Sequence, residues 1–120
     1  VIARAMIPKV LSERTRREQP DAASRVEAIM ASQRPEAIAA ASRGMALRAD
    51  RTHVLRNFNG PALIITGSDD ALMPLPTSEA LHAALPGSRL IVIEGAAHLS
   101  SVEAPEQFNA EVSLLLKQLA

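Results

Sequence analysis

The sequence has 120 residues, of which 48% are hydrophobic, which is enough for one modest folding unit and too short for two. Thirteen basic and thirteen acidic side chains leave no net charge, so no long-range field favours nucleic acid or an anionic membrane surface. The absence of cysteine excludes a disulfide framework and a thiolate metal site, and it is compatible with a cytoplasmic location.

The first residues carry no sign of a targeting segment. No stretch approaches the roughly 20 apolar residues that a membrane span needs, and the N-terminus lacks the layout of a signal peptide. We therefore expect a soluble, cytoplasmic protein. Val1 is not an initiator methionine, and the residues that follow read like a chain entered within a helix, so we expect truncation or processing upstream.

The first 59 residues are predicted to be helical. Apolar periodicity and proline start signals predict helices over residues 1–17, from residue 20, from residue 35 to about residue 48, and a last turn from residue 50. Pro8 should break or restart the first helix, which makes an irregular helix pair. The apolar residues expected on the inner faces include Val26, Ile29, Met30, Ile38, Ala41 and Met45.

Strands and helices alternate in the second half. The predicted elements are strands at residues 62–66 and 90–93, a connecting helix at about 77–85 and a last helix at about 105–119. Neither strand has polar alternation, which is typical of parallel strands covered on both faces. Leu81 and Leu85 should be buried, and the last helix should pack flat on the sheet. Its apolar face consists of Phe108, Val112, Leu115, Leu116 and Leu119. These elements predict the α/β class.

Each predicted strand ends in a glycine-containing loop that presents one ionisable side chain. Asp70 follows Gly67 in the first loop, and His98 follows Gly95 in the second. A crossover of this length joins parallel strands, so both loops should lie at the same carboxyl edge of the sheet, where open α/β sheets bind ligands. An acid followed by a histidine is also the chain order of the last two members of a Ser…Asp/Glu…His triad.

These residues also have plain structural interpretations. Asp70 could satisfy backbone donors in its turn, and His98 could cap the segment that follows. We interpret His53 and His82 as solvated helix residues and residues 100–103 as a capping box. No spacing typical of metal ligands is present, and neither loop has a phosphate-binding glycine pattern, so no metal or nucleotide site is predicted.

The second half is similar to a known family. The pattern P-x-L-I-I-x-G-x-x-D-x-x-x-P, then P-G-x-x-L-x-x-I, G-x-x-H and E-x-P-E-x-F, resembles the C-terminal part of an α/β-hydrolase, most like the 3-oxoadipate enol-lactonase and small esterase group. The resemblance implies a partial α/β-hydrolase fold, with residues 1–59 as a helical cap, or lid, and residues 60–120 as the C-terminal part of the core. It implies that Asp70 is the triad acid and His98 the triad base.

The resemblance also implies a substrate class and its contacts. A carboxylic ester or an enol-lactone is the expected substrate, and no cofactor is expected. The cap residues expected to contact the substrate are Met6, Leu11, Met30 and Met45. Methionines more often fill irregular gaps in a core, so a packing role stays open for them.

One element of the family pattern is missing from the sequence. It contains neither the nucleophile elbow G-x-S-x-G nor an HGGG-type oxyanion segment, so this chain alone should be inactive. Two alternatives stay open: a non-catalytic hydrolase half that acts only through association, and a dehalogenase-like member with an aspartate nucleophile. The strand at 62–66 should have an unpaired edge, so we expect it to pair with the N-terminal half of the hydrolase or with a second copy.

Overall fold

The computed structural model describes residues 2–119, which form a helical first half followed by a strand–helix–strand–helix unit. The first half contains α1 (Ile2–Val10), α2 (Glu13–Glu18), α3 (Pro20–Ala31), α4 (Pro35–Ala46) and α5 (Thr52–Leu55). The second half contains β1 (Ala62–Gly67), α6 (Leu75–Ala84), β2 (Ser88–Ile93), α7 (Ser100–Glu103) and α8 (Pro105–Leu119). The predicted α/β class is confirmed.

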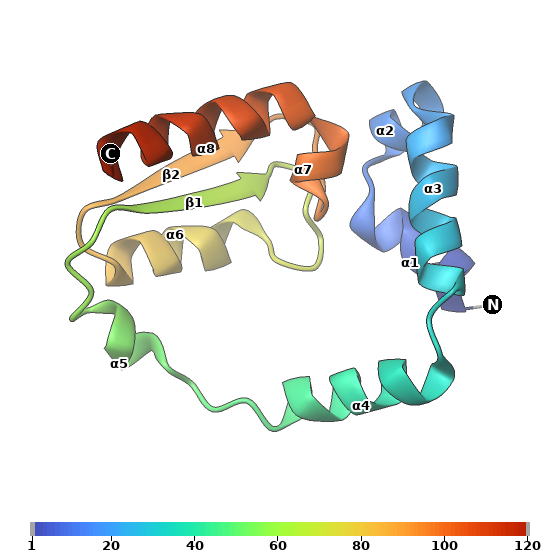
Figure 1. The fold of residues 1–120 in the computed structure, drawn as a ribbon, viewed down its shortest axis with the longest axis horizontal. Helices are drawn as coiled ribbons and strands as arrows, with labels where there is room; N and C mark the ends of the chain where they lie inside the picture. The colour runs from blue at the N-terminus through green and yellow to red at the C-terminus, as the bar shows by residue number, and fades with distance from the viewer. Residues whose placement is uncertain (1, 120) are drawn as a thin grey trace.

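The sheet consists of β1 and β2, which run parallel. Their register pairs Ala62 with Ser88 and Gly67 with Ile93. In Figure 1, α6 lies on one side of these strands and α8 on the other, so both faces of the sheet have a helix over them. Both strands are longer than predicted, because backbone pairing extends past the apolar run at the end of β1 and at the start of β2.

A helical group lies beside the carboxyl ends of both strands. Figure 1 shows α1, α2 and α3 next to the arrowheads of β1 and β2, with the short helix α7 between them and the sheet. The buried core of this group consists of Ile7, Val10, Leu11 and Val26. Leu99, which directly follows His98, packs against this core, so apolar burial links the helical group to the loop after β2.

Two expectations about the first helices are wrong. Pro8 lies inside α1, which continues to Val10, so the break between the first two helices falls after Val10 and not at the proline. The hydrogen bond from Leu11 N–H to the Ile7 carbonyl continues the helix past it. Ile29 was expected on the inner face of α3 and is exposed, whereas Val26 is buried there as predicted.

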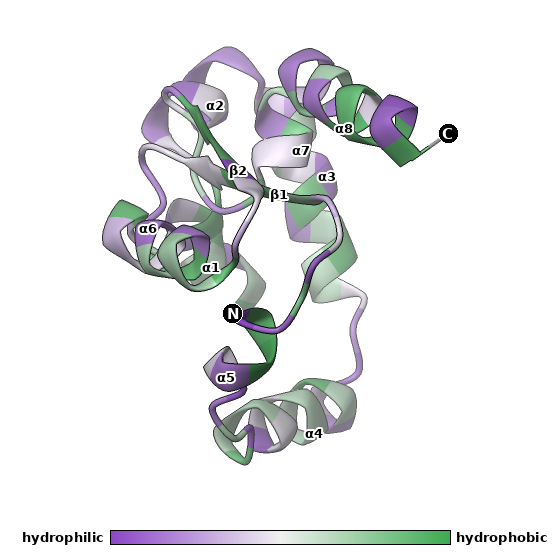
Figure 2. Cartoon of the chain, turned by 90° about the vertical axis from the view of Figure 1, so that its left-hand side faces the viewer, coloured by the Kyte–Doolittle hydropathy of each residue, from purple (hydrophilic) through white to green (hydrophobic). Residues whose placement is uncertain are grey.

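Helix α4 forms as predicted but buries none of its residues. Met45, expected on its inner face, is 61% exposed. Figures 1 and 2 show α4 apart from the sheet, and Figure 2 shows apolar residues along it. An amphipathic pattern predicts that a face can pack, and it does not specify that the partner lies in the same stretch of chain.

The two helices on the sheet differ from prediction in detail. α6 begins at Leu75, two residues early, and Leu81 is exposed where burial was expected. On α8, Phe108, Val112 and Leu115 are half-buried. Leu116 and Leu119 are exposed, so the covered face of α8 is narrower than the apolar pattern predicted. Arg89 of β2 and Glu111 of α8 form an ion pair that ties the helix to the strand.

Candidate active site

The loop after β1 is held by close contacts with the backbone of the loop after β2. An added Cβ at Gly67 would overlap the carbonyl oxygens of Ala96 and Ala97, so only glycine allows the end of β1 to approach the second loop this closely. The Asp69 N–H also donates to the Ala96 carbonyl at 2.9 Å. The two loops therefore contact each other through the backbone before any side chain is considered.

The Asp70 carboxylate is held in place by the turn that it begins. Its Oδ1 accepts hydrogen bonds from the N–H groups of Leu72 and Met73, each at 2.9 Å. A carboxylate bonded to amides two and three residues later is a local turn stabilised by its own aspartate. This geometry leaves Oδ2 available for a partner outside the turn.

The loop after β2 turns at Gly95, whose φ of +70° lies in the left-handed region. The Gly95 N–H donates to Ser68 Oγ at 2.8 Å, which fixes this turn to the first loop. Ala96 and Ala97 are buried, and His98 follows them into a more open position. The two buried alanines thus fix the backbone directly before His98.

Asp70 and His98 meet as the sequence predicted. His98 Nδ1 lies 2.9 Å from Asp70 Oδ2. The Asp70 side chain is 6% exposed and the His98 side chain 38% exposed. Because an ionised carboxylate can only accept, the ring proton sits on Nδ1, and Nε2 is the nitrogen that can accept a proton from another molecule.

The surroundings of Asp70 favour its charged form. Burial raises the pKa of this carboxyl, but the hydrogen bond from the Met73 N–H, the His98 ring and the Leu72 N–H together outweigh it, so the pKa of Asp70 lies below its ordinary value. At neutral pH the group is a carboxylate. A buried carboxylate on Nδ1 of a partly exposed imidazole gives a histidine suited to general base work.

A family profile decides what this arrangement belongs to. The profile described as the alpha/beta hydrolase fold matches residues 14–105, more than half of the chain. The chain belongs to the α/β-hydrolase family. The predicted partial α/β-hydrolase fold is therefore confirmed, from the second helix to the start of the last.

Two solved structures match nearly the whole chain. A thermophilic esterase from Thermogutta terrifontis superposes with a TM-score of 0.93 at 35% sequence identity, over 98% of this chain and 43% of its own. The enol-lactonase from Burkholderia xenovorans LB400 superposes with a TM-score of 0.89 over 97% of this chain and 44% of its own. Its 22% identity shows a shared fold alone.

Curated relatives match a shorter stretch. The putative carbamate hydrolase RutD of Escherichia coli is 45% identical over 73 residues, which is 61% of this chain and 26% of the relative. The chain thus spans about a quarter of the length of the curated relatives that it matches, and less than half of the similar solved structures.

The four cap residues predicted to contact substrate lie in three different settings. Met6 and Met30 line one hollow of about 690 Å³, between α1, α3 and α4. Leu11 is 1% exposed and belongs to the helical core, and Met45 lies exposed on α4. Substrate contact by these residues stays a prediction, as does the boundary between cap and core at residue 60.

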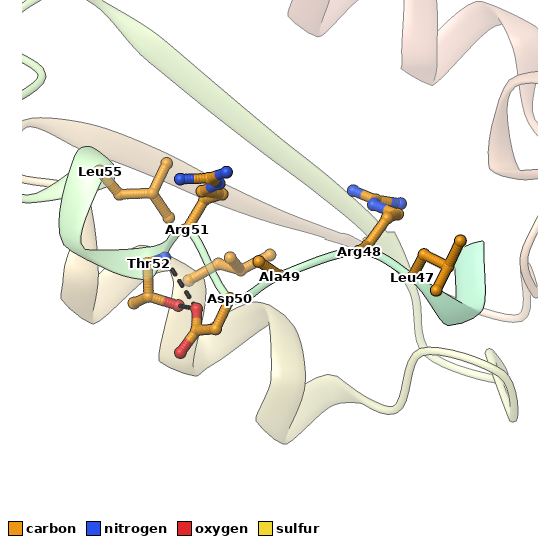
Figure 3. A pocket seen from close by; sticks show the side chains of 8 residues that line it. Leu47, Arg48, Ala49, Asp50, Arg51, Thr52 and Leu55 are labelled. Atoms are coloured by element: carbon orange, nitrogen blue, oxygen red, sulfur yellow. Dashed lines mark hydrogen bonds between the residues drawn. The ribbon is translucent and has the colours of Figure 1, made fainter. Parts of the chain in front are cut away.

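A second hollow of this α/β-hydrolase chain, of about 620 Å³, lies between residues 47–52, α5 and α6. Figure 3 shows Asp50 bonded to Thr52, and in this view the side chains of Arg48 and Arg51 point to the other side of the segment. These bonds from the Thr52 hydroxyl and N–H lower the pKa of Asp50 and begin the turn of α5. Neither hollow has Asp70 or His98 in its lining.

Glu103 was interpreted wrongly from the sequence. Residues 100–103 were expected to form a capping box, but no side chain caps α7. Glu103 is instead buried and accepts hydrogen bonds from Ser12, Thr15 and Ala97. The E-x-P-E-x-F pattern contained this residue, yet two of its partners, Ser12 and Thr15, lie far away in the sequence and only the fold brings them to it.

The remaining histidines lie at exposed positions of α5 and α6. His53 and His82 are exposed as expected, although His82 Nδ1 also contacts Ser88 Oγ at 2.7 Å. Within residues 2–119, no group of three or more His, Asp or Glu side chains is placed to hold a metal ion. Over the same residues, none of the helices combines the length and the apolar character needed to span a bilayer.

Proposed function

We propose that this chain supplies the acid and the base of a serine-hydrolase triad that acts on a carboxylic ester or an enol-lactone. Asp70 is the acid and His98 the base. The observation that carries this proposal is the 2.9 Å contact between His98 Nδ1 and Asp70 Oδ2, at the edge of the sheet where the family has its active site. The serine and the oxyanion donors come from residues outside this chain.

The reaction follows from the protonation state of His98. Nε2 accepts the proton of the serine hydroxyl as its oxygen attacks the carbonyl carbon, and Asp70 stabilises the imidazolium that forms. The imidazolium then gives the proton to the leaving alkoxide or enolate, which yields an acyl-enzyme. A water molecule repeats the cycle with His98 as base, releasing the acid and restoring the serine.

The substrate class is supported by the named relatives. The Thermogutta terrifontis protein is an esterase, and at 35% identity it is similar along nearly the whole chain. Carbamates are a second candidate substrate. The match to a putative carbamate hydrolase is shorter than the match to the esterase, but its sequence identity is higher, at 45%. Both substrates have an acyl carbon bonded to a leaving oxygen or nitrogen, so the same acid and base serve either.

We also propose that the open edge of β1 pairs with the N-terminal half of the hydrolase, or with a second copy of the chain in its absence. Two strands make a poor independent sheet, and the similar solved structures are more than twice as long as this chain. Light scattering at micromolar concentration should therefore give a dimer or larger species. A stable, well-folded monomer would contradict the proposal. We also propose that the protein is cytoplasmic.

A chimera tests the catalytic proposal. In it, this chain replaces the segment of the Thermogutta terrifontis esterase on which it superposes, so that the esterase supplies the missing half. The chimera should hydrolyse a p-nitrophenyl ester, and His98→Ala should lower kcat by a hundredfold or more, as removal of a general base does. Rates on an enol-lactone and on an aryl carbamate then rank the substrate classes.

His53→Ala is the matched control, because it removes an exposed histidine of the same chain. It should leave the rate unchanged. A folded chimera that retains its full rate after His98→Ala would overturn the assignment. The dehalogenase-like alternative predicts an aspartate in place of the elbow serine in the upstream coding sequence, and the non-catalytic alternative predicts a folded but inactive chimera.

A further inference from the structure

Glu103 joins two distant parts of the chain through its two carboxylate oxygens. It ends α7 and is 3% exposed. Oε1 accepts a hydrogen bond from the Ala97 N–H at 2.8 Å, directly before His98. Oε2 accepts from the Ser12 N–H and from the Thr15 hydroxyl, each at 2.8 Å, at the corner between α1 and α2. One oxygen holds the histidine loop and the other holds the helical corner.

Only a carboxylate fits all these donors. The three groups that face Glu103 are neutral N–H or O–H donors, and an ionised carboxylate is the side chain that offers acceptors in every direction. A glutamine of the same size has one acceptor oxygen and one NH₂ donor. Whichever way it turns, its NH₂ faces either the Ala97 N–H or the Ser12 N–H, so one end of the bridge is lost.

Three further hydrogen bonds join the same two parts of the chain. The Leu99 N–H donates to the Val10 carbonyl at 3.1 Å. Arg14 Nη2 donates to the Glu94 carbonyl at 3.0 Å, and its guanidinium occupies the space beside Gly95. Gln19 Nε2 donates to the Glu103 carbonyl at 3.0 Å. The whole segment from residue 94 to residue 103 is therefore held against residues 10–19, with Glu103 as the buried centre.

We propose that Glu103 is a positioning residue. It couples the orientation of the His98 ring to the position of the corner between α1 and α2. The proposal rests on the proposed function, since it concerns the residue assigned as base. The bond to Oε1 fixes the N–H of Ala97, the residue before His98. The bonds to Oε2 fix the Glu103 carboxylate from the side of the helices. Movement of the corner is therefore passed to the loop that carries the imidazole, with Glu103 as the buried link among these contacts.

The orientation of His98 can be measured without any activity. In the wild-type chain, ¹⁵N NMR of the His98 ring should show the Nδ1–H tautomer, and the Ala97 amide should exchange slowly. Glu103→Gln should speed Ala97 exchange by about tenfold or more and give a mixture of ring tautomers. The control Glu106→Gln changes an exposed glutamate three residues along the chain and should alter neither signal.

Thr15→Val is the milder test, because it keeps the side-chain shape and removes one donor to Oε2 without touching the histidine loop. It should still speed Ala97 exchange, which a local packing role for Thr15 does not predict. If Glu103→Gln does not fold, this variant decides. Unchanged Ala97 exchange and ring tautomer in Thr15→Val, or in a folded Glu103→Gln, would overturn the proposal.

The same variants in the chimera connect orientation to rate. Glu103→Gln should lower kcat by tenfold or more while KM changes little, because His98 and not the substrate is displaced. Suppose that the wild-type chimera is inactive, while the His98 ring tautomer and Ala97 exchange respond to the variants as expected. That result would count against the proposed function only. An active chimera in which Glu103→Gln changes neither kcat nor the ring signals would count against the role of Glu103 only.

Discussion

Asp70 makes the pH dependence of stability predictable at the scale of one residue. Its pKa in the folded chain lies below the ordinary value of about 4, so the charged group stabilises the folded state. That contribution is complete above the ordinary pKa and is lost as pH falls through the lowered one. Asp70→Asn should therefore lower the free energy of unfolding by roughly 1–2 kcal/mol at pH 7 and by less near pH 2 to 3.

Urea denaturation at both pH values measures this difference. Asp69→Asn is the matched control, since Asp69 is the exposed neighbour in the same loop and should cost less at neutral pH. An equal loss of stability for Asp70→Asn at pH 7 and near pH 2 to 3 would contradict a native state that favours the carboxylate.

Gly67 gives a second prediction at this scale. A methyl group there overlaps the carbonyl oxygens of Ala96 and Ala97, so Gly67→Ala should destabilise the chain by about 2 kcal/mol or more and displace the histidine loop. Gly44→Ala is the control, because nothing lies within 4 Å of its added Cβ and alanine favours helix by about 1 kcal/mol. Thermal unfolding compares the two, and a neutral Gly67→Ala would count against the close approach.

The contact between Asp70 and His98 was predictable from the sequence, because the position of each residue follows a local rule. Each stands a fixed few residues after an apolar run and a glycine, and parallel strands carry their ends to one edge. Glu103 was not predictable. Its local spacing fits a capping box, and its actual partners, Ser12 and Thr15, are some ninety residues away in the chain.

At the scale of elements, the order of strands and helices followed from periodicity and proline signals, while burial did not. Ile29, Leu81 and Met45 all lie at apolar positions of predicted helices and are all exposed. The pattern locates a face that can pack. What packs on it depends on tertiary neighbours, and for α4 none of the described residues buries that face.

The exposed face of α4 leads to a prediction about local stability. A helix without buried residues is held mainly by its own hydrogen bonds, which are marginal at this length. Amide hydrogen exchange in the 120-residue chain should be fastest among the long helices in α4, and slower in α3, which buries Val26. Protection in α4 equal to that in α3 would show that the face is already covered.

At the scale of the whole molecule, the chain is one part of an α/β-hydrolase architecture. It carries two parallel strands, their covering helices and a helical group at the carboxyl edge, and it superposes on 43% of the Thermogutta terrifontis esterase. The proposed chemistry needs a nucleophile that this sequence does not contain, so catalytic claims are best tested in the chimera.

A double-mutant cycle in that chimera tests most directly whether Asp70 and His98 act as one catalytic unit. Rates of p-nitrophenyl ester hydrolysis are measured for Asp70→Asn, for His98→Ala and for the double variant. Since Asp70 acts only through His98, the double variant should be no slower than His98→Ala alone. Losses that multiply, or an Asp70→Asn chimera that keeps the full rate, would contradict the account.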